Sequence, residues 1–452
     1  MDKFVSAPIK VLNALSPSAS TKSSDSVQSE PDAPLEYRNL LMDMCGGKSD
    51  HVLWIECLKR FDWYGEGKFD FNMDKFGVPV LKNGDYKLNL ATECVDRYNK
   101  DQPEDHHKIY WEGNYWTPTE DDCVLVSIQT EEILMKKAGN VIKTLGVARG
   151  DTVLVVMPFI IQLPIVFMAC VRIGAVFSLF DATNTAESIA DAINLTQPKL
   201  IITTDGFWWG AEKIEVKARV DAALDIVKDK IKATPNVVVI RHGGYDSALP
   251  PVSPSKQILG RRPIYDLNVP IDPDRDYKWA NLMLGASEHC DPEKMDTEDP
   301  MVINLRVRNG EWSSREYSTS QMALLAAVLR QTFGDEPSGA IWPLLDADNL
   351  IFVTSLLAIP LSSSSLLLFE GQLDFPNSER LWNVISKYKV EKLILNLTSC
   401  QLLMRKELHL ANASARSLKV ILTVFTSKQE SDKAAEWIRV TFPGAKHVAI
   451  VY

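Results

Sequence analysis

Apolar and amphipathic segments alternate along the middle of the chain. Residues 153–157 are continuously apolar and stop at Pro158, a pattern that predicts a buried strand ending at the proline. Pro164 then suits the first turn of a helix. Repeated alternation of this kind is typical of a largely parallel sheet with helices on its faces. The expected elements of this half are helices at 131–145, 164–173, 186–195 and 216–232 and strands at 152–157, 176–180, 199–203 and 236–241.

A second alternating block follows a connecting segment, residues 246–300, that is rich in proline and aspartate. Its expected helices lie near 320–333, 378–388 and 428–442, and its strands near 392–395, 419–424 and 446–451. A chain of 452 residues exceeds what one compact core usually holds, so several subdomains are expected. We therefore predict an α/β protein in four segments: a disordered tail at 1–34, an N-terminal segment at 35–150, a first α/β subdomain with its connector at 151–300, and a second α/β subdomain at 301–452.

The apolar run from Val153 to Val171 is long enough to be considered as a membrane span. Gln162 and two prolines interrupt the run, so a strand–turn–helix unit is favoured and no membrane span is expected. The tail is rich in Ser, Pro and Ala, lacks an apolar region after a basic start, and has no arginine among its first thirty residues. Neither a secretory nor a mitochondrial leader is therefore expected, which favours a cytoplasmic location.

Composition narrows the classes of partner. The chain has 49 basic and 59 acidic residues, a formal net charge of −10, and is 46% hydrophobic and 24% charged. The acidic balance argues against a nucleic-acid or anionic-membrane binder, and the apolar content argues against global disorder. Seven cysteines without a CxxC pair indicate reduced thiols and no disulfide framework.

The common catalytic motifs are missing. The sequence holds no GxSxG elbow, HExxH helix, EF-hand loop or GxGxxG loop. Gly47-Lys48-Ser49 lacks the earlier glycine and the preceding strand of a phosphate loop, and His106-His107 has no further metal ligands at suitable spacing. Trp208-Trp209 could stack on a planar ligand, although paired loop aromatics more often cover the edge of a core. These patterns predict neither a catalytic residue nor a metal site.

Several segments nevertheless resemble, in order and spacing, the acetyl-CoA synthetases, which are AMP-forming acetate–CoA ligases of the adenylate-forming superfamily. The clearest are Trp111-Glu112-Gly113-Asn114 and Met168-Ala169-Cys170-Val171-Arg172-Ile173-Gly174-Ala175-Val176, joined by 89–97, 145–151, 186–191, 201–206, 295–300 and 369–371. The resemblance runs from about Leu35 to the end and is stronger before Pro300 than after it. It implies the large N-terminal domain of that family: two sheets with flanking helices plus a small distorted β-barrel. The family's chemistry uses ATP, Mg²⁺ and CoA.

The family's glycine-rich phosphate loop is altered in this chain. The aligned segment reads Leu305-Arg306-Val307-Arg308-Asn309-Gly310-Glu311-Trp312-Ser313-Ser314-Arg315. A phosphate loop needs glycines so that backbone N–H groups can approach the oxygens, and a lysine to meet their charge, yet one glycine and no lysine is present. Asn309-Gly310 is a strong signal for a hairpin turn. A turn is therefore favoured over a phosphate site rebuilt from Arg306, Arg308 and Arg315.

Other family motifs have changed in the same direction. Phe425-Thr426-Ser427 aligns with the Gly-Glu-Pro that lines the adenine site, and Asp346 or Asp348 aligns with an aspartate whose following Trp, Gly and His are missing. Trp208 and Ala211 stand in place of two arginines that meet CoA phosphates. The sequence also stops before the family's Trp-Trp-Gln-Thr-Glu and the small, mobile C-terminal domain.

These departures predict an acetyl-CoA synthetase-like pseudoenzyme, degenerate and truncated, that needs no cofactor and is left with a binding or regulatory role. The residues named for its sites are then equivalents of family motifs and not active groups. A protein partner stays open, and nucleic acid is not expected. The alternative is an active AMP-forming acetate or short-chain acyl–CoA ligase that uses ATP and CoA through an altered phosphate site.

Overall fold

A computed structural model describes most of the chain. The described residues are 33–47, 50–65, 71–75, 77–81, 86–98, 100, 107–117, 120–242, 269–308, 310–334, 339–377, 379–405, 416–425 and 427–451. Residues 1–32 of the predicted disordered tail are outside the described residues, and so are Lys48, Ser49 and His106.

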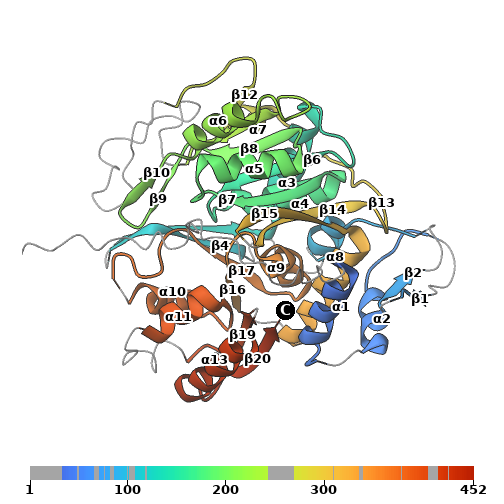
Figure 1. The fold of residues 1–452 in the computed structure, drawn as a ribbon, viewed down its shortest axis with the longest axis vertical. Helices are drawn as coiled ribbons and strands as arrows, with labels where there is room; N and C mark the ends of the chain where they lie inside the picture. The colour runs from blue at the N-terminus through green and yellow to red at the C-terminus, as the bar shows by residue number, and fades with distance from the viewer. Residues whose placement is uncertain are drawn as a thin grey trace, which may run out of the picture.

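The first large sheet contains seven strands, and the expected parallel strands form its centre (Figure 1). Its order is β12 (Asp276–Lys278), β11 (Asn236–Ile240), β8 (Leu200–Thr204), β6 (Thr152–Met157), β7 (Val176–Asp181), β14 (Pro300–Arg308) and β15 (Glu311–Ser318). Every pair is parallel except β14–β15. β14 and β15 are joined across residues 309 and 310, with Arg308 opposite Glu311, which confirms the hairpin predicted from Asn309-Gly310.

The second large sheet also contains seven strands. Its order is β20 (Lys446–Val451), β19 (Val420–Phe425), β18 (Lys392–Asn396), β16 (Ala340–Leu344), β17 (Ser365–Phe369), β4 (His107–Thr117) and β5 (Glu120–Ser127). Only β4–β5 is antiparallel. Each sheet is therefore completed by one antiparallel hairpin. β14–β15 follows the other strands of its own sheet, whereas β4–β5 precedes the whole first sheet and yet belongs to the second.

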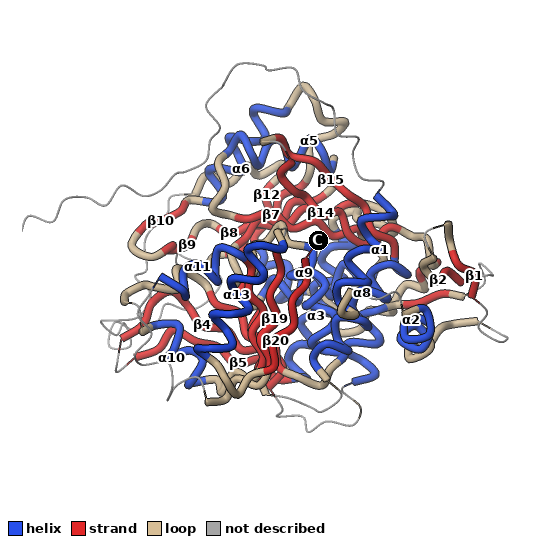
Figure 2. The backbone as a smooth tube through the Cα atoms, turned by 60° about the horizontal axis from the view of Figure 1, so that its bottom comes forward, coloured by secondary structure: helices blue, strands red, loops and turns tan. Residues whose placement is uncertain are grey.

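The helices form three layers around the two sheets. α5 (Ala186–Thr196) and α6 (Val216–Val227) cover the outer face of the first sheet with one buried cluster. α10 (Arg380–Lys387), α11 (Leu397–Arg405) and α13 (Lys428–Thr441) cover the outer face of the second, and Figure 2 shows α13 along β19 and β20. The largest cluster lies between the sheets and contains α3 (Ile128–Thr144), α4 (Gln162–Ile173), α8 (Thr319–Phe333) and α9 (Leu350–Leu361).

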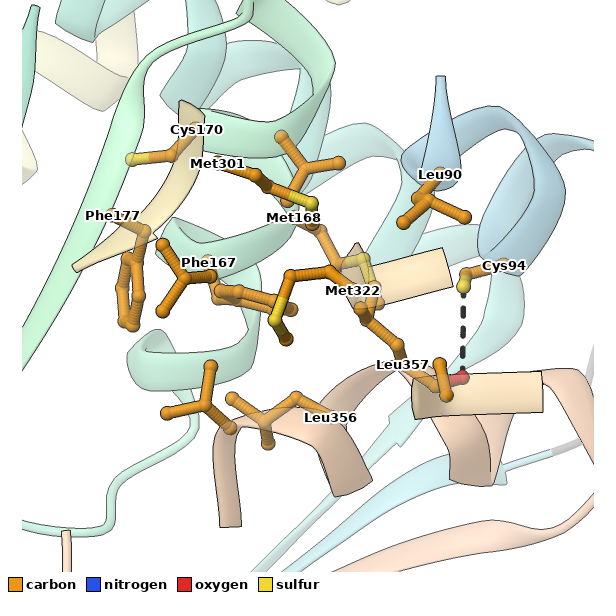
Figure 3. Close-up of a cluster of buried hydrophobic side chains, with 14 of the residues drawn as sticks. Leu90, Cys94, Phe167, Met168, Cys170, Phe177, Met301, Met322, Leu356 and Leu357 are labelled. Atoms are coloured by element: carbon orange, nitrogen blue, oxygen red, sulfur yellow. Dashed lines mark hydrogen bonds between the residues drawn. The ribbon is translucent and has the colours of Figure 1, made fainter. Parts of the chain in front are cut away.

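The central layer is the main apolar core of the molecule. Figure 3 shows Phe167 and Met168 of α4 facing Met322 of α8 and Leu356 of α9, with Phe177 of β7 beside them. The rings of Phe167 and Phe177 meet edge to face with centroids 4.9 Å apart. This cluster joins the two sheets, so the fold is one continuous packed body across the described residues.

The remaining elements lie outside the two large sheets, and several of them contribute buried residues to the central core. They are helices α1 (Ala33–Met44), α2 (His51–Leu58) and α7 (Trp279–Gly285), a π-helix at Thr92–Arg97, and the strand pairs β1 (Phe71–Met73) with β2 (Pro79–Leu81), β3 (Lys87–Leu88) with β13 (Met295–Asp296), and β9 (Phe207–Trp209) with β10 (Glu212–Ile214). Outside the two large sheets the described strands form two-stranded pairings alone, so the small distorted barrel is not seen in this part of the chain.

The α/β fold predicted from the alternating pattern is confirmed. The apolar run at 153–171 is β6 followed by α4, as expected, and within the described residues no helix has both the length and the apolar character needed to cross a bilayer. Among the strands of the two large sheets the pattern missed β4, β5, β12, β16 and β17, and among the helices it missed α7, α9 and α11. The domain boundaries stay a prediction, although β14 and β15, placed beyond residue 300, pair with the strands of the first α/β segment.

Candidate functional site

A cavity of about 400 Å³ opens where the two large sheets face each other. Each of five strands contributes its last residue to the wall of the cavity: Met157 of β6, Asp181 of β7, Leu344 of β16, Phe369 of β17 and Asn396 of β18. In open α/β sheets ligands bind outside the carboxyl ends of parallel strands, because the loops that leave these ends diverge there. The cavity is therefore the candidate binding site of the fold.

Aromatic side chains form much of the wall. Trp342 and Phe369 meet edge to face with ring centroids 5.8 Å apart, and Phe159 and Trp209 also line the cavity. Trp209 lies in the β9–β10 hairpin, so the aromatic pair singled out in the sequence contributes one ring to this site. Such surfaces bury apolar or planar ligands and attract cations to the ring faces.

The polar part of the wall is acidic. Asp181, Asp346, Glu370 and Asp374 line the cavity, and no lysine, arginine or histidine is among its lining residues in the described part of the chain. Asp346 has its pKa raised to about 6, first because the carboxyl is partly withdrawn from water and then because Asp348 and Asp181 repel its charge. Asn396 opposes this shift by donating a hydrogen bond to the Asp346 carboxylate.

A substitution of Asp346 by Asn tests this electrostatic arrangement. The raised pKa means that the folded protein disfavours the ionised carboxylate, so its protonated form contributes stability below about pH 4 that is lost as the pH rises to about 6. The unfolding free energy of D346N relative to the wild type should therefore increase over this range, by at most about 1 kcal/mol because the side chain is open to solvent. Urea unfolding at several pH values measures the difference, and a difference that does not change with pH would contradict the assignment.

One end of the cavity is held by Asn114 and Gly371. The amide of Asn114 accepts from the Gly210 N–H at 2.9 Å and donates to the Gly210 carbonyl at 2.8 Å, which fixes the turn of the β9–β10 hairpin. Gly371 has a φ of +116°, and a Cβ there would lie 2.2 Å from the Asn114 side-chain oxygen. Both residues belong to segments that carried the family resemblance, and here they position the wall that bears Trp209.

Glu112 of the same motif is the centre of a buried ionic cluster next to the cavity. Arg380 donates to Glu112 Oε1 at 2.7 Å, Lys387 lies 2.7 Å from Oε2, and the Tyr388 hydroxyl donates to Oε2. The side chains of Arg380 and Glu112 are 1% and 0% exposed. The pKa of Tyr388 is raised, mainly by burial and by the Glu112 charge. This glutamate is therefore a structural anchor between β4 and α10.

A second cavity, of about 460 Å³, holds the segment aligned with the phosphate loop. Arg306 on β14 and Arg315 on β15 both line it, and both are paired with Glu36 on α1. Arg306 Nη1 donates to Glu36 Oε1 at 3.0 Å and Arg315 Nη1 donates to Oε2 at 2.6 Å. Asp346, Asn396 and Thr398 line both cavities, so the two spaces adjoin.

The other residues aligned with family motifs do not gather at one place. Gly310 is in the β14–β15 turn, Phe425 is buried at the end of β19 and lines the second cavity, and Ser427 precedes α13. Trp208 and Ala211 lie in the β9–β10 hairpin but not in the wall of either cavity, and Ala211 is exposed. Asn309, Thr426 and the side chain of Arg308 fall outside the described part of the structure. Among the equivalents that the structure describes, Arg306, Arg315 and Phe425 share the wall of the second cavity, and the two arginines converge on Glu36.

Sequence reasoning missed Glu36 and the acidic wall. Glu36 lies about 270 residues from Arg306, and nothing local to a short amphipathic helix marks such a pairing. The sequence did contain a signal for Asp181 as a site residue. It directly follows the predicted strand at 176–180 and so falls at the carboxyl edge of the parallel sheet. Its meeting with Asp346 required the relative placement of the two sheets.

Comparisons with known proteins agree with this fold. The sequence family described as "AMP-binding enzyme" matches residues 132–304. The acetyl-coenzyme A synthetase of Drosophila melanogaster is 30% identical over 380 residues, 82% of this chain and 54% of that protein. The acetyl-coenzyme A synthetase of Psychrobacter cryohalolentis is 25% identical over 403 residues, 87% of this chain and 56% of that protein. The chain thus spans about half the length of these curated relatives.

A solved structure extends the likeness to three dimensions. The acetoacetyl-CoA synthetase from Streptomyces lividans superimposes with a TM-score of 0.67, covering 93% of this chain and 63% of that one. The two sequences are 14% identical, so this likeness shows the fold alone.

Proposed function

Since this chain is an acetyl-CoA synthetase-like member of the AMP-binding enzyme family, we propose that it keeps the adenylate-forming scaffold, does not form an acyl-adenylate, and acts by binding. The observation that carries the proposal is the position of Glu36. Its carboxylate accepts a hydrogen bond from Nη1 of Arg306 and from Nη1 of Arg315, and so offsets the positive charge that would otherwise meet a phosphate.

The charges around the second cavity support the same conclusion. The described cationic residues in its lining are Arg306 and Arg315. The same lining contains three carboxylates, those of Glu36, Asp346 and Asp348. A triphosphate brought to this wall would meet a net negative charge. Stabilising the charge that develops in phosphoryl chemistry depends on preorganised cations, and each missing donor of this kind costs about 3 kcal/mol in the transition state.

The residues present also fit Mg·ATP and CoA poorly. From Val302 to Arg308, β14 is paired with β15 through backbone hydrogen bonds. The family's loop would instead offer its backbone N–H groups to phosphate. Trp208 and Ala211 offer no guanidinium to a CoA phosphate.

ATP–pyrophosphate exchange with acetate is the direct test. We expect the purified chain to give no exchange above the buffer rate, alongside an active acetyl-CoA synthetase as the positive control. In E36Q the two arginines lose their anionic partner, so calorimetry should show ATP binding about tenfold tighter than in the wild type, still without exchange. Exchange by the wild type that is abolished in R306A would overturn the proposal and establish the ligase instead.

A further inference from the structure

The first cavity is suited to a ligand of the opposite charge from a nucleotide. Its carboxylates come from separate elements: Asp181 ends β7, Asp346 follows β16, and Glu370 follows β17. Asp181 is half-buried and Asp346 is open to solvent, and within the described residues neither forms an ion pair with a lysine or arginine. The pKa of Asp346 is raised first by partial burial and then by the repulsion of the Asp348 and Asp181 charges.

Glu370 shows that the acidic wall is built and not incidental. Its side chain is 2% exposed, lines the cavity, and accepts from His242 through Oε2 at 2.7 Å. The hydrogen bond from His242 satisfies this buried carboxylate from the protein side. Asp181 and Asp346 have no such cationic partner among the described residues, so a cation on the cavity side would balance the acidic wall.

The aromatic rings stand next to these carboxylates. Trp342 is 1% exposed and lines the cavity beside Phe369. Carboxylates combined with the faces of tryptophan and phenylalanine rings form the surroundings in which proteins hold organic ammonium groups. The volume of about 400 Å³ falls in the range that small-molecule sites occupy.

We propose that this cavity binds a small organic cation, an amine with an apolar or aromatic body, whose ammonium group lies between Asp181 and Asp346 and whose body packs against Trp342, Phe369 and Trp209. The site discriminates against carboxylic acids and nucleotides, because its lining offers them no cation. The proposal goes beyond the proposed function and is tested independently of it. ATP–pyrophosphate exchange activity would disprove the proposed function, whereas the charge of the preferred ligand decides whether the cavity binds organic cations.

Three probes of nearly equal shape and different charge test the proposal by calorimetry at about pH 7.5 and low salt: phenethylammonium, 2-phenylethanol and phenylacetate. Phenethylammonium should bind at least about tenfold more tightly than the alcohol, and phenylacetate more weakly than either. Equal or tighter binding of phenylacetate would overturn the proposal, as would the absence of saturable binding by phenethylammonium up to millimolar concentration.

Two variants test where the ammonium group lies within the cavity. D346N and D181N should each weaken phenethylammonium binding about tenfold and leave 2-phenylethanol binding unchanged. D432N removes an exposed carboxylate on α13, far from the lining residues, and should leave both affinities unchanged. Circular dichroism melts confirm that the variants fold. Unchanged phenethylammonium affinity in both folded cavity variants would refute the assignment.

The pH dependence gives an independent readout. Asp346 is faced by Asp181 from β7, Asp348 from its own loop and Asn396 from β18, with Glu370 and Asp374 further along the wall. As the pH falls from about 7.5 to about 5, Asp346 gains its proton and phenethylammonium binding should weaken. The same change should be smaller in D346N, and an equal loss in both proteins would contradict a role for this carboxylate.

Discussion

Replacing Glu112 with leucine is expected to lower the free energy of unfolding by about 3–5 kcal/mol, because it leaves the buried Arg380 guanidinium without its anion. Lys387 is partly exposed and can turn toward water, whereas Arg380 is 1% exposed and cannot. Urea unfolding followed by circular dichroism measures the loss.

Two further variants separate the charge effect from packing. In the double variant E112L/R380M an apolar pair replaces the ionic one, and we expect it to recover more than half of the loss. D432A removes one member of the exposed Lys428–Asp432 pair and should cost less than about 0.5 kcal/mol. An E112L protein within 1 kcal/mol of the wild type would show that this cluster does not anchor β4 to α10.

Replacing Gly371 with alanine is expected to cost about 3 kcal/mol, from two separate causes. The residue has a φ of +116°, where a side chain strains the backbone, and its new Cβ would lie 2.2 Å from the oxygen of the buried Asn114. Asn114 must then leave Gly210, so the β9–β10 hairpin loses its anchor. Thermal and urea unfolding report the loss of stability.

Gly334 is the matched control, because it has a φ of +87° and nothing within 4 Å of the site of a Cβ. G334A should therefore show the backbone cost alone, at least about 1 kcal/mol, because its φ of 87° and ψ of 165° lie in a region that is almost restricted to glycine. Any further loss of unfolding free energy in G371A, beyond the loss in G334A, is the cost of displacing Asn114. Equal losses in the two variants would mean that Asn114 yields freely and does not fix the hairpin.

The parts of the fold that follow local rules were predictable from sequence. The β6–α4 unit was marked by Pro158 and Pro164, and the β14–β15 hairpin by Asn309-Gly310. α9 was missed because eleven of its twelve residues are buried, which removes the helical alternation of apolar and polar positions. β4 and β5 were missed because their polar and aromatic sequence gives no regular period.

The two cavities were less predictable than the fold. The sequence identified Arg306 and Arg315 as the residues to examine, but whether they would face a phosphate or a carboxylate depends on Glu36, which the N-terminal helix supplies. Likewise the acidic wall joins Asp181 to Asp346 across two sheets. Contacts between distant elements of this kind depend on tertiary packing, which the pattern along the chain does not encode.

The pairing of the β4–β5 hairpin with strands that are made much later has a consequence for biosynthesis. β4 is made early, yet its parallel neighbour is β17, where Leu366 lies opposite Ile109. At the usual speed of translation the ribosome needs on the order of tens of seconds to synthesise the intervening chain. During that interval one edge of the β4–β5 ribbon is unprotected and open to other nascent chains. Chaperone demand during synthesis should therefore be greatest between the emergence of β5 and that of β17.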